Sequence, residues 1–310
     1  MTFLELAKKI VLEENKPLSS DEIWQIAKSK GYDKPLKSEG KTPDYTLGAT
    51  VYSDAKSGSD STFVSIGARP KKFFLRELAS EEVLKQFENQ APIATPVPKK
   101  TGYDESDLHP FVAYFAKLHL QAFTKTISHL KSEKKQFGEW VHPDIVGCYF
   151  PLEDWKPEVV DFGAVIGNTA VKMFSFELKK ELNFSNLREA FFQTVSNSSW
   201  ANEGYLVAAE ISTDEDFRAE LRRLAGSFGI GVIKVQVDDP NSSEILFPAR
   251  TKENLDWDAM NKLTMNADFK GFLKRIKTDI QSKEVRKEQY DEILKPDELI
   301  GLLKKKQGAG

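Results

Sequence analysis

Two charged side chains lie close together in the stretch FSFELKK, which covers residues 174–180. Written as a β-strand, it places Phe174, Phe176 and Leu178 on one face and Glu177 and Lys179 on the other, because successive side chains point to opposite sides of a sheet. The apolar face predicts packing on a core. The other face is expected to be hydrated, so that an acid and a base can meet there and complete their environment with a ligand.

A second acid, Asp144, begins another strand-like segment, DIVGCYF. If the two strands are neighbours, Asp144 can approach Glu177. Two adjacent carboxylates repel each other unless a cation lies between them, and oxygen ligands of this kind suit Mg²⁺. Such a metal would polarise a phosphate and generate a hydroxide, while Lys179 orients the water or neutralises the developing charge. These are the requirements of phosphodiester hydrolysis.

The same short patterns also occur by chance, so an accidental ion pair is the competing interpretation. Glu-x-Lys recurs at Glu14, Glu39 and Glu133, and Pro-Asp recurs at Pro43 and Pro296. Context separates the pair of interest, because Asp144 and Glu177 both fall on predicted strands, in that order, and a helix follows the second strand.

The elements around these residues predict a mixed sheet flanked by helices, an α/β arrangement. We expect a long amphipathic helix over 107–130 and a helix over about 186–196. Strands are expected in VKMFSFELKK, GYLVAAE and IGVIKVQV, with a helix in DFRAELRRLAGSF between the last two. Beyond Arg250 the chain is expected to be helical and charged, and to end in a solvated tail.

Residues 107–237 resemble the PD-(D/E)xK nuclease superfamily, which includes Mrr-like restriction endonucleases. The resemblance implies that Asp144 and Glu177 bind the metal and that Lys179 assists the water. The helix after the catalytic strand often supplies a polar residue in this superfamily. Gln193 is preferred to Arg188 for this role because it lies in an otherwise apolar run.

Other polar and aromatic residues near these segments have ordinary structural explanations. Glu139 could add a carboxylate but could equally lie in the turn before the strand. His142, beside a proline, is interpreted as a loop residue outside the site. Trp200 and Tyr205 could stack on bases, although core packing is the preferred interpretation.

The N-terminal part predicts three helices followed by a hairpin. Thr2 with Glu5 and Ser19 with Glu22 have the spacing of capping boxes, Gly31 can end the second helix, and Pro43 can start a third. The segments TFVSIG and KKFFLRE alternate like two strands joined by a turn. Three helices and a hairpin describe a winged helix-turn-helix, in which one helix can lie in the major groove of DNA.

Residues 1 to about 78 resemble the HARE-HTH domain, through SSDEIWQIAKSKGY, GKTPDYTLGATVYSDAKSGSDSTFVSIG and KKFFLRE. The resemblance implies a winged helix that engages DNA, and protein binding is the alternative. In the hairpin turn, Arg69, Lys71 and Lys72 could contact phosphates without reading sequence, although a solvated hairpin tip would have the same composition.

Composition sets broad limits. The chain has 310 residues, a net charge of −3 and one cysteine, Cys148. This excludes an internal disulfide, and neither the cysteine nor the four histidines have the spacing of a zinc site. No apolar run has the length of a membrane span, and the N-terminus does not resemble a secretion signal. A cytoplasmic protein that does not bind membranes is therefore expected.

The sequence predicts a winged-helix domain over 1–89, a proline-containing linker over 90–106, and a nuclease-like domain with a helical C-terminal extension over 107–310. The expected function is a Mg²⁺-dependent endonuclease that acts on double-stranded DNA, in restriction or phage defence, with the winged helix as reader. A homodimer is one arrangement that would let two such sites cut both strands. The alternatives are a non-catalytic DNA-binding regulator, whose α/β domain dimerises or senses a ligand, and a nuclease acting on RNA or single strands.

Overall fold

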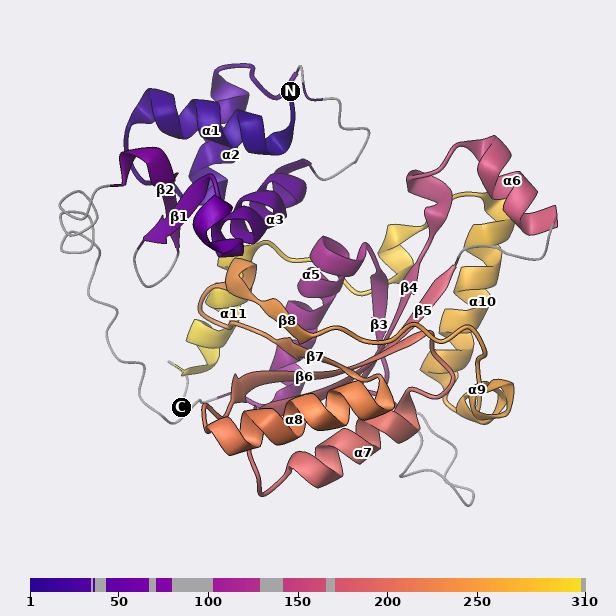
Figure 1. Cartoon of the computed structure of the whole chain (residues 1–310). Coiled ribbons are helices and arrows are strands. Elements are labelled where there is room, and N and C mark those ends of the chain that lie inside the picture. Colours follow the sequence, from indigo (N-terminus) through magenta and orange to yellow (C-terminus); the bar gives the residue numbers. More distant parts are fainter. Residues whose placement is uncertain are drawn as a thin grey trace. The chain divides into compact units, whose positions relative to one another are not determined.

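The chain forms two compact units, Met1–Thr101 and Gly102–Gly310, each with its own sheet (Figure 1). The computed structural model describes residues 1–34, 36, 43–66, 71–79, 103–128, 142–165 and 171–307. Among the helices in these ranges, none combines the length and the hydropathy that a membrane crossing requires.

The N-terminal unit contains three helices and a two-stranded antiparallel sheet, in the order predicted for a winged helix-turn-helix. Its elements are α1 (Phe3–Glu14), α2 (Ser20–Ser29), α3 (Pro43–Lys56), β1 (Phe63–Ile66) and β2 (Lys72–Leu75), with 3₁₀ turns at Gly58–Asp60 and Arg76–Leu78.

Local signals in the sequence start and end these helices. Thr2 and Glu5 form a capping box at α1, and Ser19 and Glu22 form one at α2, so that backbone donors without partners in the first turn are satisfied. Gly31, just past α2, adopts a φ of 70°, which a residue without Cβ does at little cost. The apolar faces then close one core. Its fully buried members include Leu6, Ile10, Ile23, Phe63 and Phe73.

The C-terminal unit contains six strands and several helices. Its helices are α5 (His109–Leu120), α6 (Pro157–Val165), α7 (Leu187–Asn197), α8 (Glu215–Phe228), α9 (Trp257–Leu263), α10 (Ala267–Ser282) and α11 (Pro296–Gln307). Its strands are β3 (Phe123–Thr126), β4 (Ile145–Tyr149), β5 (Lys172–Leu182), β6 (Glu203–Ile211), β7 (Gly231–Lys234) and β8 (Glu244–Phe247). Short 3₁₀ turns lie at Glu105–Leu108, Pro151–Glu153, Pro240–Ser242 and Lys287–Gln289.

The six strands follow the chain order across the sheet, β3-β4-β5-β6-β7-β8. The central pairs β5–β6 and β6–β7 are parallel, and α7 and α8 make the crossovers between them. The remaining pairs, β3–β4, β4–β5 and β7–β8, are antiparallel. The predicted mixed sheet flanked by helices is confirmed.

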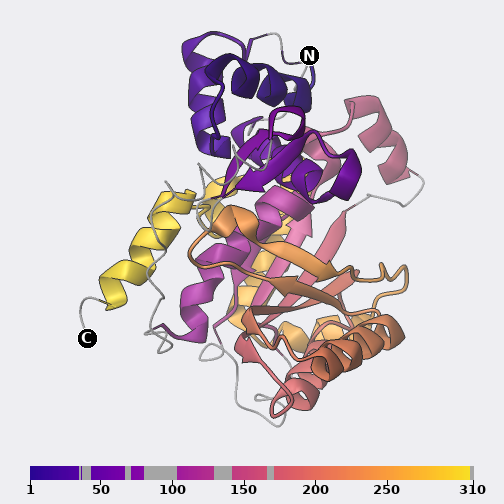
Figure 2. The same cartoon turned by 60° about the vertical axis from the view of Figure 1, so that its left-hand side comes forward.

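Helices cover both faces of this sheet. Figures 1 and 2 show α7 and α8 side by side on one face and α5 on the other. On the α7 face, one apolar cluster joins β6 and β7 to α7 and α8, and a second joins β3 and β4 to α10. The predicted C-terminal extension is therefore helical, but α10 belongs to the core through Phe269, Phe272 and Ile276.

One predicted element is wrong. The long helix expected over 107–130 ends at Leu120, Gln121 adopts a φ of 52°, and the chain continues as strand β3. Tertiary contacts favour the strand, because β3 pairs with β4 and the backbone nitrogen of Asp291 donates to the oxygen of Thr124 at 2.8 Å. The Asp291 carboxylate also accepts from the hydroxyls of Thr124 and Thr126 at 3.1 and 3.2 Å.

A glycine brings the end of α7 close to the sheet. A Cβ atom placed on Gly204, in β6, would lie 2.3 Å from Cβ of Ser198 and 2.4 Å from its Oγ. Real side chains do not approach this closely, so only glycine allows Ser198 to rest on β6. Because Ser198 follows α7 directly, Gly204 sets the height of the end of this helix above the sheet.

Replacing Gly204 by alanine is therefore expected to destabilise the C-terminal unit by about 1–3 kcal/mol through overpacking. The matched control is Gly271→Ala in α10, where a Cβ meets nothing within 4 Å. That change should stabilise its helix by about 0.5–1 kcal/mol. Urea unfolding of both variants measures the two effects, and equal stability of Gly204→Ala and wild type would contradict the close approach.

Candidate functional site

Asp144 and Glu177 lie opposite each other on neighbouring strands. Ile145 of β4 pairs with Phe176 of β5, and continuing this antiparallel register by one residue places Asp144 across from Glu177. A hydrogen bond fixes the position, because the backbone nitrogen of Leu178 donates to Oδ2 of Asp144 at 2.8 Å. The condition set by the sequence, that the two strands be neighbours, is met.

Glu177 is buried, with 1% of its surface exposed, so the prediction of a hydrated face on β5 is wrong. The reason is the packing on that face. Glu177 pairs with Leu206, which belongs to the apolar cluster under α7 and α8, and Val146, beside Ser175, belongs to the cluster under α10. The carboxylate therefore lies at the junction of two apolar clusters, beside the C-terminal end of α7.

Both oxygens of this carboxylate accept hydrogen bonds. Nζ of Lys179 donates to Oε1 at 3.2 Å, and Nδ2 of Asn197 donates to Oε2 at 3.0 Å. The same Nδ2 also donates to the backbone oxygen of His142 at 3.2 Å. The site thus joins β5, the end of α7 and the segment that leads into β4.

Burial raises the pKa of Glu177 to about 7, and the negative charge of Asp144 acts in the same direction. The positive charge of Lys179 and the hydrogen bond from Asn197 act against this rise but do not cancel it. The negative charge that two carboxylates place here is therefore only partly compensated by protein groups.

Lys179 lies at the rim of the site, with 18% of its side chain exposed. Burial lowers its pKa, but the charges of Glu177, Glu105 and Asp144 outweigh that effect, so the pKa is raised overall. Lys179 therefore remains a cation at neutral pH. Glu105 is held nearby, because the backbone nitrogen of Lys180 donates to its Oε1 at 3.3 Å.

The remaining predicted site residues are spread over several environments. Gln193 is partly exposed on α7, and among the described residues its side chain makes no hydrogen bond or ion pair; Arg188 is exposed. Trp200 and Tyr205 are buried at 1% and 3% exposure, which confirms the core interpretation, and Glu139 lies outside the described residues.

Sequence reasoning missed Asn197 and the backbone of His142. Asn197 lies one helical turn after Gln193, so both residues face the same side of α7, and the position in the helix decides which of them reaches Glu177. A usable signal was present, because a polar residue at the end of the crossover helix follows the apolar run that packs on the sheet. The contribution of His142 is its carbonyl oxygen, which no residue type reveals.

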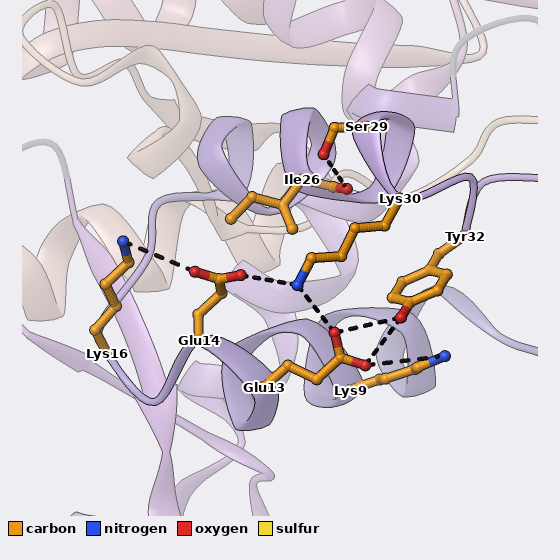
Figure 3. Close-up of polar contacts among 8 residues, drawn as sticks. All are labelled: Lys9, Glu13, Glu14, Lys16, Ile26, Ser29, Lys30 and Tyr32. Atoms are coloured by element: carbon orange, nitrogen blue, oxygen red, sulfur yellow. Dashed lines mark hydrogen bonds and ion pairs between the residues drawn. The ribbon is translucent and has the colours of Figure 1, made fainter.

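In the N-terminal unit, a network of ion pairs joins the ends of α1 and α2 (Figure 3). Nζ of Lys30 donates to Glu13 at 3.0 Å and to Glu14 at 2.9 Å, and the hydroxyl of Tyr32 donates to Glu13 at 3.2 Å. Lys9 lies over the ring of Tyr32, 3.6 Å from its centre. The hydrogen bonds to Glu14 and Glu13 raise the pKa of Lys30 to about 12. Because acids and bases balance here, this surface presents little net positive charge.

The wing of this unit carries the predicted cations. Lys71 is partly exposed, and Lys72 lies 3.6 Å from Glu22, with about half of each side chain exposed. Exposed pairs of this kind are weak, so a phosphate can compete with Glu22 for Lys72. Arg69 lies outside the described residues.

Comparison with known proteins identifies the N-terminal part. Residues 1–78 match the HARE-HTH family, whose description names the HTH domain of ASXL and restriction endonuclease proteins, so this part of the chain is a HARE-HTH domain, as predicted. The match supports DNA binding by the N-terminal unit. It ends at residue 78, and the nuclease resemblance of the C-terminal unit stays a prediction.

Two further comparisons add no assignment. The chain is similar to a solved structure of SPO1766 from Silicibacter pomeroyi, a protein of unknown function, with 14% identity and a TM-score of 0.30. That similarity covers 60% of this chain and 94% of the other, and it is too weak to carry a conclusion. None of the curated proteins matches the chain.

The raised pKa of Glu177 predicts a pH-dependent stability. A carboxyl group whose pKa is higher in the folded state, about 7 against 4.5, binds its proton more tightly after folding. Its stabilising contribution is full below pH 4.5 and is lost as the pH rises through 7. Without divalent cations, Glu177→Gln should therefore flatten this loss and gain on the order of 3 kcal/mol over wild type at pH 8 relative to pH 4.

Native-state hydrogen exchange of the β5 amides at the two pH values measures this difference within the C-terminal unit. Glu181→Gln, an exposed acid on the same strand, is the matched control and should retain the pH dependence of wild type. A Glu177→Gln variant that follows the wild-type pH profile would contradict the assignment.

Proposed function

We propose that the chain is a Mg²⁺-dependent DNA endonuclease of the restriction or phage-defence type, in which the HARE-HTH domain holds the DNA. The observation that carries the proposal is the meeting of Asp144, Glu177 and Lys179 on two neighbouring strands. The description of the matched family, which includes restriction endonuclease HTH domains, supports the same setting.

The residues present fit a magnesium ion. Asp144 and Glu177 supply two carboxylates at one point, and their mutual repulsion raises the pKa of Glu177. A divalent cation would relieve this repulsion. Among the described residues, no group of three or more His, Cys, Asp or Glu side chains is arranged to hold a metal. Mg²⁺ does not require such a cage, because it commonly binds through one or two carboxylates, retaining waters and contacting substrate phosphates.

Asp144 and Glu177 would hold the ion, which when bound lowers the pKa of a water and stabilises negative charge on a phosphate. The contribution of Lys179 follows from its protonation state. Because it stays a cation, it would donate to the attacking water or to a phosphate oxygen rather than remove a proton. Its partial exposure at the rim allows the backbone of a nucleic acid to reach it.

Cleavage of supercoiled plasmid in the presence of Mg²⁺ tests the proposal. Wild type should cut, and Asp144→Ala, Glu177→Ala and Lys179→Ala should each lower the rate more than about a hundredfold, because each removes a group that stabilises the charge in the transition state. Glu181→Ala is the matched control and should retain activity, since Glu181 is exposed on the same strand.

The choice of substrates separates the alternatives. Unmodified plasmid, cytosine-modified plasmid, single-stranded DNA and RNA are tested side by side. Cleavage of RNA or single strands alone would replace the duplex assignment. An intact set of substrates together with retained DNA binding would indicate instead a DNA-binding regulator.

A second prediction concerns the wing. Replacing Arg69, Lys71 and Lys72 together by alanine should reduce the slope of log affinity for DNA against log salt by up to about 2.7, since each lost phosphate contact removes about 0.9. The matched control replaces Lys8, Lys9 and Lys16 of the first helix and its end, with the same change in charge. Fluorescence anisotropy across a salt series measures both slopes, and equal slopes for the two triple variants would remove the wing from the interface.

A further inference from the structure

Asn197 makes the contact to Glu177 that no predicted residue accounts for. It is the last residue of α7 and is buried, with 3% of its surface exposed. Its Nδ2 donates to Oε2 of Glu177 at 3.0 Å, while Lys179 occupies Oε1. The carboxylate is therefore clamped at both oxygens. Since an ionised carboxylate has about four lone-pair sites, two hydrogen bonds leave sites for a further ligand.

The orientation of the Asn197 amide is determined by its neighbours. Both groups next to Nδ2, the Glu177 carboxylate and the His142 carbonyl, accept hydrogen bonds. Turning the amide over would place Oδ1 against two acceptors. In the observed orientation Oδ1 is buried and has no hydrogen-bond partner among the described residues. A buried acceptor without a partner is unfavourable, so the arrangement favours the bond to Glu177 over complete satisfaction of the asparagine.

The backbone at Asn197 is fixed independently of its side chain. Its carbonyl oxygen accepts from Oγ of Ser175 at 3.0 Å and from Nε1 of Trp200 at 2.8 Å. The next residue, Ser198, rests on Gly204. The amide therefore extends from an anchored point, which is the requirement for a group that orients another one.

From these contacts we propose that Asn197 is a positioning residue, which fixes the Glu177 carboxylate opposite Asp144 for binding a divalent cation. This inference rests on the proposed metal-dependent function and adds to it the residue that orients the ligand. It also reassigns the role that sequence reasoning gave to Gln193. The two amides lie on the same face of α7, but only Asn197 is in contact with the carboxylate.

Three variants of the full chain test the proposal. Asn197→Ala removes the donor. Asn197→Leu fills most of the space without a donor, so a common effect of the two variants is not due to a cavity. Gln193→Ala removes the neighbouring amide of the same helix face. Asn266→Ala is the stability control, because Asn266 is a buried asparagine that caps α10 through its bonds to Asp268 and Phe269.

The first measurement needs neither metal nor activity. In protein labelled with ¹³C at glutamate carboxyls, the Glu177 signal is identified by its absence in Glu177→Gln. At a fixed pH of about 8.5, where the free carboxyl is ionised, this signal should move in both Asn197 variants and stay in place in Gln193→Ala and Asn266→Ala. An unmoved signal in the Asn197 variants would overturn the positioning role.

The second measurement titrates Mg²⁺ alone by calorimetry. Loss of a hydrogen bond that orients a metal ligand typically weakens metal binding by about 10- to 100-fold, and this loss is expected for both Asn197 variants. At saturating Mg²⁺, kcat for plasmid should fall while KM for DNA changes less than about twofold, because the DNA-contacting surface is untouched.

The outcomes distinguish this inference from the proposed function. Failure of wild type to bind Mg²⁺ or to cut DNA would refute the metal-dependent function, and the inference with it, even if the Glu177 signal moves as expected. Binding and cleavage by wild type, with Asn197 variants that lose only stability in the manner of Asn266→Ala, would leave the function intact and refute the inference alone.

Discussion

The burial of one carboxylate is the constraint on which the C-terminal unit depends. A charged group under two apolar clusters is tolerated only when hydrogen bonds and charges replace the water it loses. Lys179 supplies one donor from the same strand, and Asn197 supplies the other from the end of α7. The second donor reaches its position only because Gly204 lets the chain after α7 approach the sheet. Helix placement, strand register and the glycine thus serve a single side chain.

The two units use charge in different ways. In the HARE-HTH domain the acids and bases around Lys30 are exposed, so water and salt screen them and each pair contributes little energy. In the C-terminal unit the charges around Glu177 are largely withdrawn from water, where each interaction is stronger and an uncompensated charge is costly. The first arrangement leaves a surface adaptable to a polyanion, whereas the second holds a small number of atoms in a fixed geometry.

The sequence predicts the local elements well, because their signals are local. The capping boxes at Thr2 and Ser19 and the alternation in β5 are read from neighbouring residues, and the structure confirms them. The pairing of β4 with β5, stated as a condition, is also met. What the sequence does not predict depends on distant contacts. Strand β3 forms because Asp291, far along the chain, covers its edge, although the apolar spacing there fits a helix.

The candidate site shows the same division between local and distant causes. Asp144, Glu177 and Lys179 are visible as a pattern on predicted strands. The burial of Glu177 is not, since a strand covered on both faces can still carry an acid when a helix end brings the right amide. The choice between Gln193 and Asn197 differs by one helical turn, and only the packed height of α7 decides it.

The bond from the Leu178 backbone to Asp144 has a consequence for how such a protein changes over generations. Asp144 takes the place of a partner in the junction between β4 and β5, so its loss would disturb the sheet as well as any chemistry. Lys179, at the rim, has no comparable duty to the fold. A descendant that gave up catalysis would therefore be expected to lose the lysine early and to keep the aspartate, so the aspartate alone would be a poor sign of an active enzyme.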